Sequence, residues 1–253
     1  MKNNIMYYYN INIDILYQKD NYYYFYINNI KYELAVYTRD IKEQNAILDL
    51  NRKMINSNMP VDEIILNKDN YVITFINNIP YVLSKKYIDS ENKITLNDIL
   101  FISNYNYEYN DILKRDNWDK LWSMKIDYFE YHINQNGKKY PILVDSFNYY
   151  VGLAENAISY VRNTIIDEKK ELTDNNVVSH RKININSNIN SLYDPLNIIV
   201  DHKSRDIAEY IKSSFFNNNS NIFNELDRYF MSNYYSPYGI RLLFARVLYP
   251  SYY

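Results

Sequence analysis

The first third of the chain alternates apolar and polar residues with the period of β-strands. NYYYFYIN (21–28) and IKYELAVY (30–37) are rich in aromatic and β-branched residues, and Asn28-Asn29 between them predicts a hairpin turn. Three further strands are predicted at 61–67, 70–77 and 78–87. Because the connections between these strands are short, we expect a mostly antiparallel sheet.

The pattern changes to helical spacing within residues 40–56. There, Asp40 is the predicted N-cap and Glu43, three residues later, its capping-box partner. After a polar connector, longer amphipathic stretches predict helices at 119–135 and 146–165. Shorter helices are predicted at 206–216, 221–232 and 237–248.

These elements predict an α+β protein with two lobes. Residues 1–90 form a small β-rich lobe with one helix, and residues 91–253 form a larger, mainly helical lobe. We place the boundary near residues 88–105, where the strand pattern ends.

Composition excludes several classes of function. The 28 Lys and Arg residues nearly balance the 30 Asp and Glu residues, so a nucleic-acid-binding surface is not expected. The absence of cysteine excludes disulfides and thiolate chemistry, and the three histidines lack the spacing of a zinc site. No apolar run reaches the roughly 20 residues that span a bilayer, and the N-terminus does not read as a signal peptide. We therefore expect a cytoplasmic protein.

Glycine and tyrosine contents also bear on function. With three glycines in the chain, no GxGxxG or GxxxxGK[ST] loop can be written, which excludes Rossmann and Walker-type nucleotide binding. The 31 tyrosines accompany many Asn, Ile and Lys residues, as AT-rich codons predict. They are weak evidence for carbohydrate binding or stacking.

Residues 177–216 hold the strongest candidate for chemistry. His180 opens a polar loop, Asp194 and Asp201 flank an apolar run, and Asp206 stands where a helix begins. Phosphoryl transfer uses such carboxylates to hold Mg²⁺ and to accept the proton of the attacking hydroxyl. The alternative is structural: a hydrogen-bonded His180, an Asp194-Pro195 turn, a surface pair Asp201-His202 and an N-terminal helix acid at Asp206.

The two lobes and this segment resemble the protein-kinase-like phosphotransferases. Aminoglycoside and choline kinases, and the spore-coat kinase-like proteins of the CotS and YutH type, carry HxDxxxxN, a later metal-binding Asp, and DxxxxD[LI][AR] before a helix. The chain resembles the spore-coat group most closely, through DPLNIIVDHKSRDIAEYIKSSFF (194–216) and RLLFARVLYPSYY (241–253). The resemblance implies a bilobal kinase-like fold, a metal-ligand position at Asp194 and a structural role for Asp206.

The chain departs from that pattern where catalysis would need it. Lys182 stands at the position of the catalytic aspartate, and a protonated lysine cannot accept a proton. Ser187 replaces the expected asparagine, although Asn186 and Asn188 flank it and a slipped register would supply one of them, with Asn186 as the expected cofactor contact. The phosphate-holding lysine has no clear equivalent, because Lys31 begins its strand and is expected to face solvent. Glu43 could pair with such a lysine, but we expect a solvated capping residue.

Three functions stay open at this point. The leading one is a catalytically degenerate pseudokinase that binds no cofactor and contacts protein partners, in the spore coat or during its assembly. The alternative is an active phosphotransferase that uses ATP and Mg²⁺, with Asp194 on the metal, Asn186 and Asp201 as further cofactor contacts, and Asp201 or another acid as base. The third is an unrelated α+β structural protein.

Overall fold

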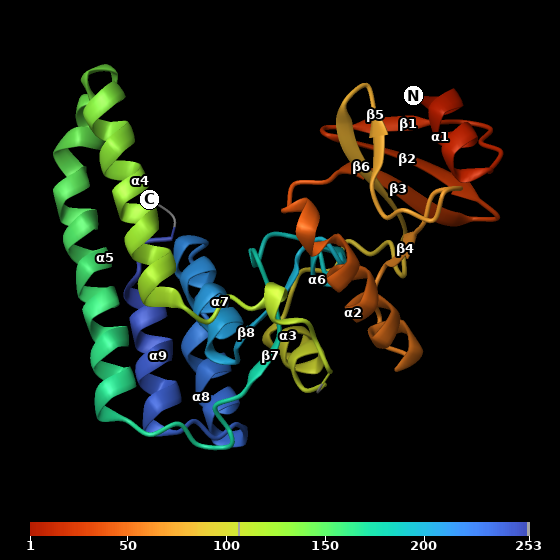
Figure 1. Ribbon diagram of the computed structural model, residues 1–253. Helices are drawn as coiled ribbons and strands as arrows, with labels where there is room; N and C mark the ends of the chain where they lie inside the picture. Colours follow the sequence, from red (N-terminus) through yellow and green to blue (C-terminus); the bar gives the residue numbers. More distant parts are fainter. Residues whose placement is uncertain (106, 252–253) are drawn as a thin grey trace. The chain divides into compact units, whose positions relative to one another are not determined.

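An antiparallel sheet and a set of long helices make up the two compact units of the chain (Figure 1). The computed structural model describes residues 1–105 and 107–251, except the side chain of Lys138. The first unit, here the sheet unit, comprises Met1–Lys114, His180–Lys182 and Asn186–Ile199. The helical unit comprises the remaining described residues.

The units divide the chain differently from the predicted lobes. The predicted boundary near residues 88–105 falls within the sheet unit, which continues to Lys114. The sheet unit also takes in residues 186–199, from the segment singled out in the sequence. Residues that lie close together in that segment therefore belong to different units.

The sheet unit is built on one antiparallel sheet, which has six strands of different lengths in the described part of the chain. Its order is β1-β2-β3-β6-β4, and β5 pairs with β6. The strands are β1 (Tyr17–Lys19), β2 (Tyr22–Ile27), β3 (Ile30–Val36), β4 (Glu63–Ile65), β5 (Thr74–Ile76) and β6 (Ile79–Lys85). The predicted α+β class with an antiparallel sheet is thus confirmed.

The core of the sheet unit follows from the strand register. Phe25 on β2, Leu34 on β3 and Leu83 on β6 are completely buried, and Leu34 lies directly opposite Leu83. Helix α1 (Lys2–Tyr9) packs Ile5 and Tyr9 into the same cluster. No pattern in the sequence predicted α1, because its asparagines are poor helix formers and its burial depends on the distant sheet.

Asparagine pairs form the tight turns of this sheet. Asn28-Asn29 and Asn77-Asn78 join β2 to β3 and β5 to β6, and all four residues have φ between 51° and 64°. Two consecutive positive φ angles are typical of the type I′ turn, whose twist matches that of the flanking strands. Asparagine is one of the few residues besides glycine that tolerate this conformation, which explains hairpins in so glycine-poor a chain.

Helices α2 (Gln44–Asn56) and α3 (Leu96–Ser103) complete the sheet unit, together with the short α6 (Asn190–Tyr193). The Asp40 side chain accepts a hydrogen bond from the backbone N–H of Lys42 and so caps the 3₁₀ turn Ile41–Glu43 that precedes α2. Thr95 and Asp98 form a reciprocal capping box at the start of α3.

In the helical unit, α4 lies alongside α5 and α9 packs between α5 and α7 (Figure 1). The helices are α4 (Trp118–Asn136), α5 (Pro141–Asp167), α7 (Ser204–Phe216), α8 (Ile222–Ser232) and α9 (Pro237–Leu248). Their core includes a stack of aromatic rings in which Trp122 lies between Trp118 and Tyr249, with centroid distances of 5.5 and 4.2 Å. Strands β7 (Asn176–His180) and β8 (Ile198–His202) pair with each other.

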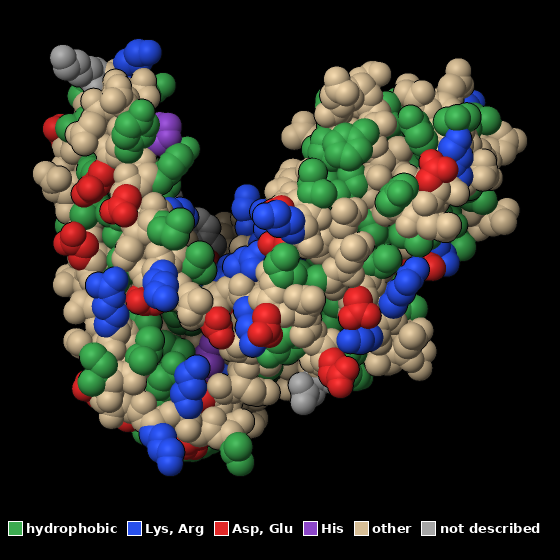
Figure 2. All heavy atoms as spheres, in the orientation of Figure 1, with side chains coloured by type: hydrophobic (Ala, Val, Ile, Leu, Met, Phe, Trp, Pro, Cys, Tyr) green, Lys and Arg blue, Asp and Glu red, His purple; other side chains and the backbone are tan. Residues whose placement is uncertain are grey.

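Among the described residues, no helix combines the length and the apolarity that crossing a bilayer requires. In Figure 2, the part of the surface that corresponds to the sheet of Figure 1 shows several hydrophobic side chains and few charged ones.

The asparagine turns give a direct test of the fold. Replacing Asn29 by valine should lower the free energy of unfolding by about 1–2 kcal/mol, because a β-branched residue is strained at positive φ. Asn29→Gly should stay within about 0.5 kcal/mol of the natural chain. Urea unfolding measures both, with Gln18→Val on exposed β1 as the control for adding a valine. Equal losses for Asn29→Val and Gln18→Val would contradict a strained turn.

Candidate functional site

A polar groove of about 510 Å³ is the main candidate site. All of its lining residues belong to the sheet unit. They come from the β1–β2 hairpin, from β3, from the segment that follows β6, and from residues 188–194. The volume lies within the range of small-molecule pockets, roughly 300–1,000 Å³.

Backbone hydrogen bonds fix residues 188–194 against the sheet unit. Asn188 forms an antiparallel bridge with Lys93, and the N–H of Ile189 donates to the carbonyl of Asn92 (2.8 Å). The N–H of Asp62 donates to the carbonyl of Tyr193 (2.9 Å). The Asn190 side chain adds one contact, since its Oδ1 accepts the N–H of Ser90 (3.2 Å). The segment therefore reaches the groove mainly through main-chain contacts.

Lys86 lines this groove and forms a buried ion pair with Asp62, which lies outside the lining. The Lys86 Nζ is 2.5 Å from Asp62 Oδ2 and 3.9 Å from Glu33 Oε2, and the N–H of Tyr87 donates to Asp62 Oδ1 (2.8 Å). Burial raises the pKa of Asp62 to about 6, against the opposing charge of Lys86. Burial acts to lower the pKa of Lys86, but the carboxylates of Asp62 and Glu33 raise it above its usual value. Both groups are therefore ionised at neutral pH.

Lys31 is also committed to a carboxylate within the groove. Its Nζ lies 2.9 Å from Asp89 Oδ1 and 5.2 Å from the centre of the Tyr24 ring. Its side chain is only 15% exposed. The expectation that Lys31 faces solvent is therefore wrong, because Asp89, on the segment after β6, binds its ammonium group.

Glu43 is a buried residue and its predicted role as a solvated cap is wrong. Its carboxylate lies 2.6 Å from Arg39 Nη2, and both side chains are less than a tenth exposed. Arg39 also donates to the carbonyls of Ile198 and Leu196. Arginine suits this position because its several N–H donors can bind a carboxylate and two carbonyls at once. The i, i+4 spacing of Arg39 and Glu43 was the available signal.

The residues predicted for the catalytic loop are held in different ways. His180 is completely buried, and its Nε2 lies 3.1 Å from the carbonyl of Leu192. Lys182 is exposed and does not line the groove; its backbone N–H and carbonyl both hydrogen-bond the Asn197 side chain. Asn186 is exposed and likewise lies outside the lining.

Asp194 does line the groove. Its Oδ1 accepts the N–H of Leu196 (2.9 Å), the arrangement of a turn opened by Asp-Pro. Its charge acts on Glu33, Asp62 and Lys86. Asn188, the other asparagine that a slipped register offered, lines the groove as well. Glu33 and Lys86 also line it, and the sequence analysis did not predict either as a site residue.

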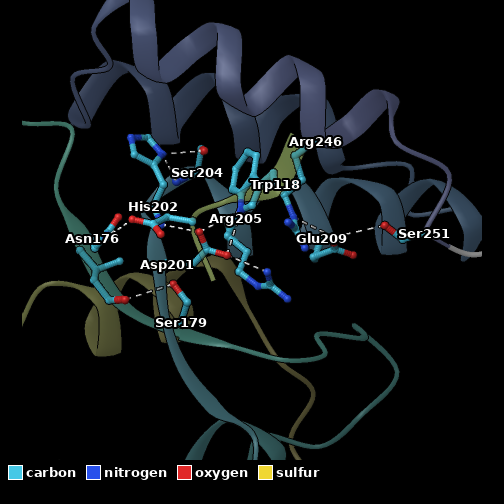
Figure 3. A network of polar contacts seen from close by, with 12 residues as sticks. Trp118, Asn176, Ser179, Asp201, His202, Ser204, Arg205, Glu209, Arg246 and Ser251 are labelled. Atoms are coloured by element: carbon cyan, nitrogen blue, oxygen red, sulfur yellow. Dashed lines mark hydrogen bonds and ion pairs between the residues drawn. The ribbon is translucent and has the colours of Figure 1, made fainter. Parts of the chain in front are cut away.

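Asp201 lies in the helical unit, at the centre of a buried polar network (Figure 3). Trp118 Nε1 donates to both of its carboxylate oxygens (3.0 and 3.1 Å), Arg205 Nη1 lies 2.7 Å from Oδ2, and the N–H of His202 donates to Oδ1. Asp201 is completely buried and His202 nearly so, which corrects the alternative of a surface pair. Burial raises the pKa of Asp201, and Arg205 opposes that shift.

The network continues along α7 to α9. Arg246 lies over the Trp118 ring and 3.1 Å from Glu209, and Glu209 also binds Lys212 at 3.0 Å (Figure 3). Asp206 is buried in the first turn of α7, where a carboxylate favours the positive end of the helix. Asp201 and Glu209 thus bind side chains of neighbouring helices, Trp118 on α4 and Arg246 on α9. The structural role expected for Asp206 stays a prediction.

His202 occupies a neutral, desolvated position. The N–H of Ser204 donates to its Nδ1 (3.2 Å), so Nδ1 accepts and Nε2 carries the proton, 3.6 Å from Asp174 Oδ1. Burial lowers the pKa of His202 to about 4, and Asp174 only partly offsets this. The imidazole therefore stays uncharged through the physiological range.

The comparisons with known proteins decide the family. The family described as "Spore coat putative kinase YutH" matches residues 2–253. The chain belongs to this YutH family. The resemblance read from residues 177–253 is thus confirmed.

A relative in the YutH family is the endospore coat-associated protein YutH of Bacillus subtilis (strain 168). It is 30% identical over 162 residues, which are 59% of this chain and 48% of the relative. The match thus spans about half the length of that relative.

Solved phosphotransferases share the fold. The aminoglycoside phosphotransferase of Alicyclobacillus acidocaldarius has a TM-score of 0.62 at 10% identity, over 96% of this chain and 80% of the other. The spectinomycin phosphotransferase APH(9)-Ia in complex with ADP and spectinomycin has a TM-score of 0.56 at 15% identity, over 82% and 71%. These similarities confirm the predicted kinase-like fold, which this YutH-family chain shares with them.

The Lys86–Asp62 pair predicts a specific stability defect. Lys86→Met should cost about 3–5 kcal/mol at pH 7, because Asp62 becomes a buried charge without a partner. The defect should shrink toward pH 5, since the raised pKa of Asp62 lets the folded state take up a proton first. Urea unfolding at both pH values measures this. Lys85→Met breaks the exposed Lys85–Glu63 pair and should cost at most about 1 kcal/mol; a defect of Lys86→Met independent of pH would contradict the pairing.

His202 predicts a second dependence on pH. Because its folded pKa lies below the unfolded value of 6.5, its contribution to stability is complete above pH 6.5 and is lost as pH falls toward about 4. The slope should reach about 1.4 kcal/mol per pH unit in that window. His202→Gln should flatten this part of the stability curve. The exposed His132→Gln should leave it unchanged, and equal slopes in all three proteins would disprove the assignment.

Proposed function

We propose that this YutH-family chain is a catalytically degenerate kinase-like protein that acts by binding protein partners in the spore coat or during its assembly. The observation that carries the proposal is the charge state of the groove. The two largely buried lysines that line it already form ion pairs with carboxylates of the protein, Lys31 with Asp89 and Lys86 with Asp62.

A nucleoside triphosphate needs cationic groups that are available to its phosphates. Moving Lys86 toward a phosphate would leave Asp62 buried and charged without its partner, at a cost of several kcal/mol. Glu33 and Asp194 on the same surface would add repulsion. The groove residues therefore disfavour a polyphosphate ligand.

The groove residues also fit Mg²⁺ poorly. Asp194 uses Oδ1 to close its own turn, and no group of three or more His, Asp and Glu residues in the described ranges is arranged to hold a metal. The β1–β2 turn places Asp20-Asn21 between Lys19 and Tyr22. A glycine-free turn of this kind gives a phosphate little access to backbone N–H groups.

The remaining requirement is a base for the acceptor hydroxyl. The family resemblance assigns the position of this base to residue 182, where the chain has a lysine. The ammonium group of Lys182 cannot accept a proton. Asp201, the alternative base, has its carboxylate filled by Trp118, Arg205 and a backbone N–H, with no exposed surface. These contacts support a binding role over a catalytic one.

The coat setting follows from the relative in Bacillus subtilis, which is named an endospore coat-associated protein. We extend that setting to this chain as part of the proposal, with synthesis in the cytoplasm before association with the coat. An active phosphotransferase is the second candidate, because the fold neighbours include phosphotransferases and Asp194 lines the groove.

A thermal-shift titration with ATP and Mg²⁺ separates the two candidates. We expect no change in Tm at millimolar nucleotide, whereas a ligand at a hundredfold excess over Kd would add about 2.7 kcal/mol of stability. A saturable, Mg²⁺-dependent shift that Asp194→Ala removes and Asp49→Ala keeps would establish the active kinase instead. Asp49 is a suitable control because it is an exposed carboxylate on α2.

A further inference from the structure

The groove of the sheet unit carries more negative than positive charge. Apart from two charged residues at its edge, its lining holds the ammonium groups of Lys31 and Lys86 and the carboxylates of Glu33, Asp89 and Asp194. Asp62, which pairs with Lys86, is a fourth carboxylate that lies outside the lining, and the six groups together have a net charge of −2. On the rim, Lys19 and Glu91 are both exposed and cancel each other.

Glu33 is a groove carboxylate whose nearest ammonium group, that of Lys86, is bound more closely by another residue. Lys86 lies closer to Asp62 than to Glu33, at 2.5 Å against 3.9 Å. Burial raises the pKa of Glu33, Lys86 opposes the shift and Asp194 adds to it. A partly buried carboxylate next to a second carboxylate is stabilised by a cation placed between them.

A row of tyrosines, here the tyrosine wall, lies beside these carboxylates, with Tyr24 on β2 directly paired with Glu33 on β3. Tyr22, Tyr24 and Tyr26 alternate along β2 and line the same groove, and Tyr17 stacks on Tyr24 with a centroid distance of 5.0 Å. Aromatic faces attract ammonium groups through their quadrupole. The groove thus combines the two kinds of surface that bind organic cations.

The protein already places one of its own ammonium groups in this setting. The Nζ of Lys31 lies 2.9 Å from the Asp89 carboxylate and 5.2 Å from the centre of the Tyr24 ring. That contact shows the geometry in which a carboxylate and a tyrosine hold an ammonium together. Glu33 and Asp194 offer the same chemistry beside it.

We propose that the groove binds an alkylammonium group, of the kind that a lysine side chain or a polyamine carries. The ammonium lies between Glu33 and Asp194, and the alkyl chain runs along the tyrosine wall. This inference rests on the proposed function, since it gives the groove a cationic guest in place of a nucleotide. Lys31 is then an internal competitor for the guest.

Calorimetric titrations of the full chain test the ligand class. The probes are spermidine, a Gly-Gly-Lys-Gly-Gly peptide with blocked ends, ATP with Mg²⁺, and maltotriose as a neutral sugar. We expect the ammonium probes to bind, more weakly as salt is added. Binding of spermidine alone identifies the polyamine source, and binding of the peptide identifies the lysine of a protein partner.

Two variants with matched controls locate the site. Glu33→Gln should weaken binding at least about tenfold, as expected for the loss of a charged partner. Lys31→Met should strengthen it, because Asp89 and Tyr24 become available to the guest. Glu63→Gln and Lys85→Met make the same changes of net charge at an exposed pair outside the groove, and neither should change the affinity.

The outcomes separate this inference from the proposed function. If neither ammonium probe binds, or if binding ignores Glu33→Gln and Lys31→Met, the ammonium site is disproved even when ATP also fails to bind. If ATP with Mg²⁺ binds and phosphate is transferred, the proposed function fails first. Binding of maltotriose in place of the ammonium probes would assign the tyrosine wall to sugars and overturn the inference.

Discussion

A charge that is removed from water must have a partner, and both units of this protein are arranged around that constraint. In the sheet unit Lys86 forms an ion pair with Asp62, and Arg39 forms one with Glu43 just before α2 begins. In the helical unit Asp201 is met by Arg205 and Trp118. Removing one member of any such pair costs more than the pair contributes, because it leaves the other member buried and charged.

The same constraint separates residues that sequence alone groups together. Asp194 and Asp201 are seven positions apart, and both are acids flanking an apolar run. β8 buries Asp201 completely, and its donors fill its oxygens, whereas Asp194 precedes the strand and keeps part of its surface at the groove. A phosphotransferase needs a carboxylate that is both ionised and reachable. Burial removes the second property from Asp201.

Local patterns predicted most of the regular structure. The alternating strands, the Asn-Asn turns and the amphipathic helices are properties of neighbouring residues, so the sequence indicates them directly. Helix α1 was not predicted, because Ile5 and Tyr9 gain their apolar contacts only once the sheet has formed. The short β1 was not predicted either, and its three residues are exposed, so no buried face marks it. The connection of residues 188–194 to Asn92 and Asp62 could not be predicted from sequence for a related reason. It consists of backbone hydrogen bonds between segments that are distant in the chain.

The candidate site was harder to predict than the fold. The departures at Lys182 and in the missing glycine loop could be read from the chain, because they compare single positions with a motif. The ion pairs of Lys31 and Glu43 could not be predicted in this way, since the distance of each residue from its partner depends on the folded backbone. Charged side chains at the starts of strands and helices are usually solvated, but neither Lys31 nor Glu43 is solvated here.

The groove of the sheet unit separates the contacts that fix its walls from the side chains that set its charge. Its walls are fixed by strand pairing and mainly by main-chain contacts of residues 188–194, to which the Asn190 side chain adds one hydrogen bond. Its electrostatic character depends on side chains that project from those walls, such as Glu33 and Lys31. Substitution at such positions alters which charge the groove accepts while the backbone contacts persist, provided that each buried charge keeps its partner, as Lys86 does in Asp62.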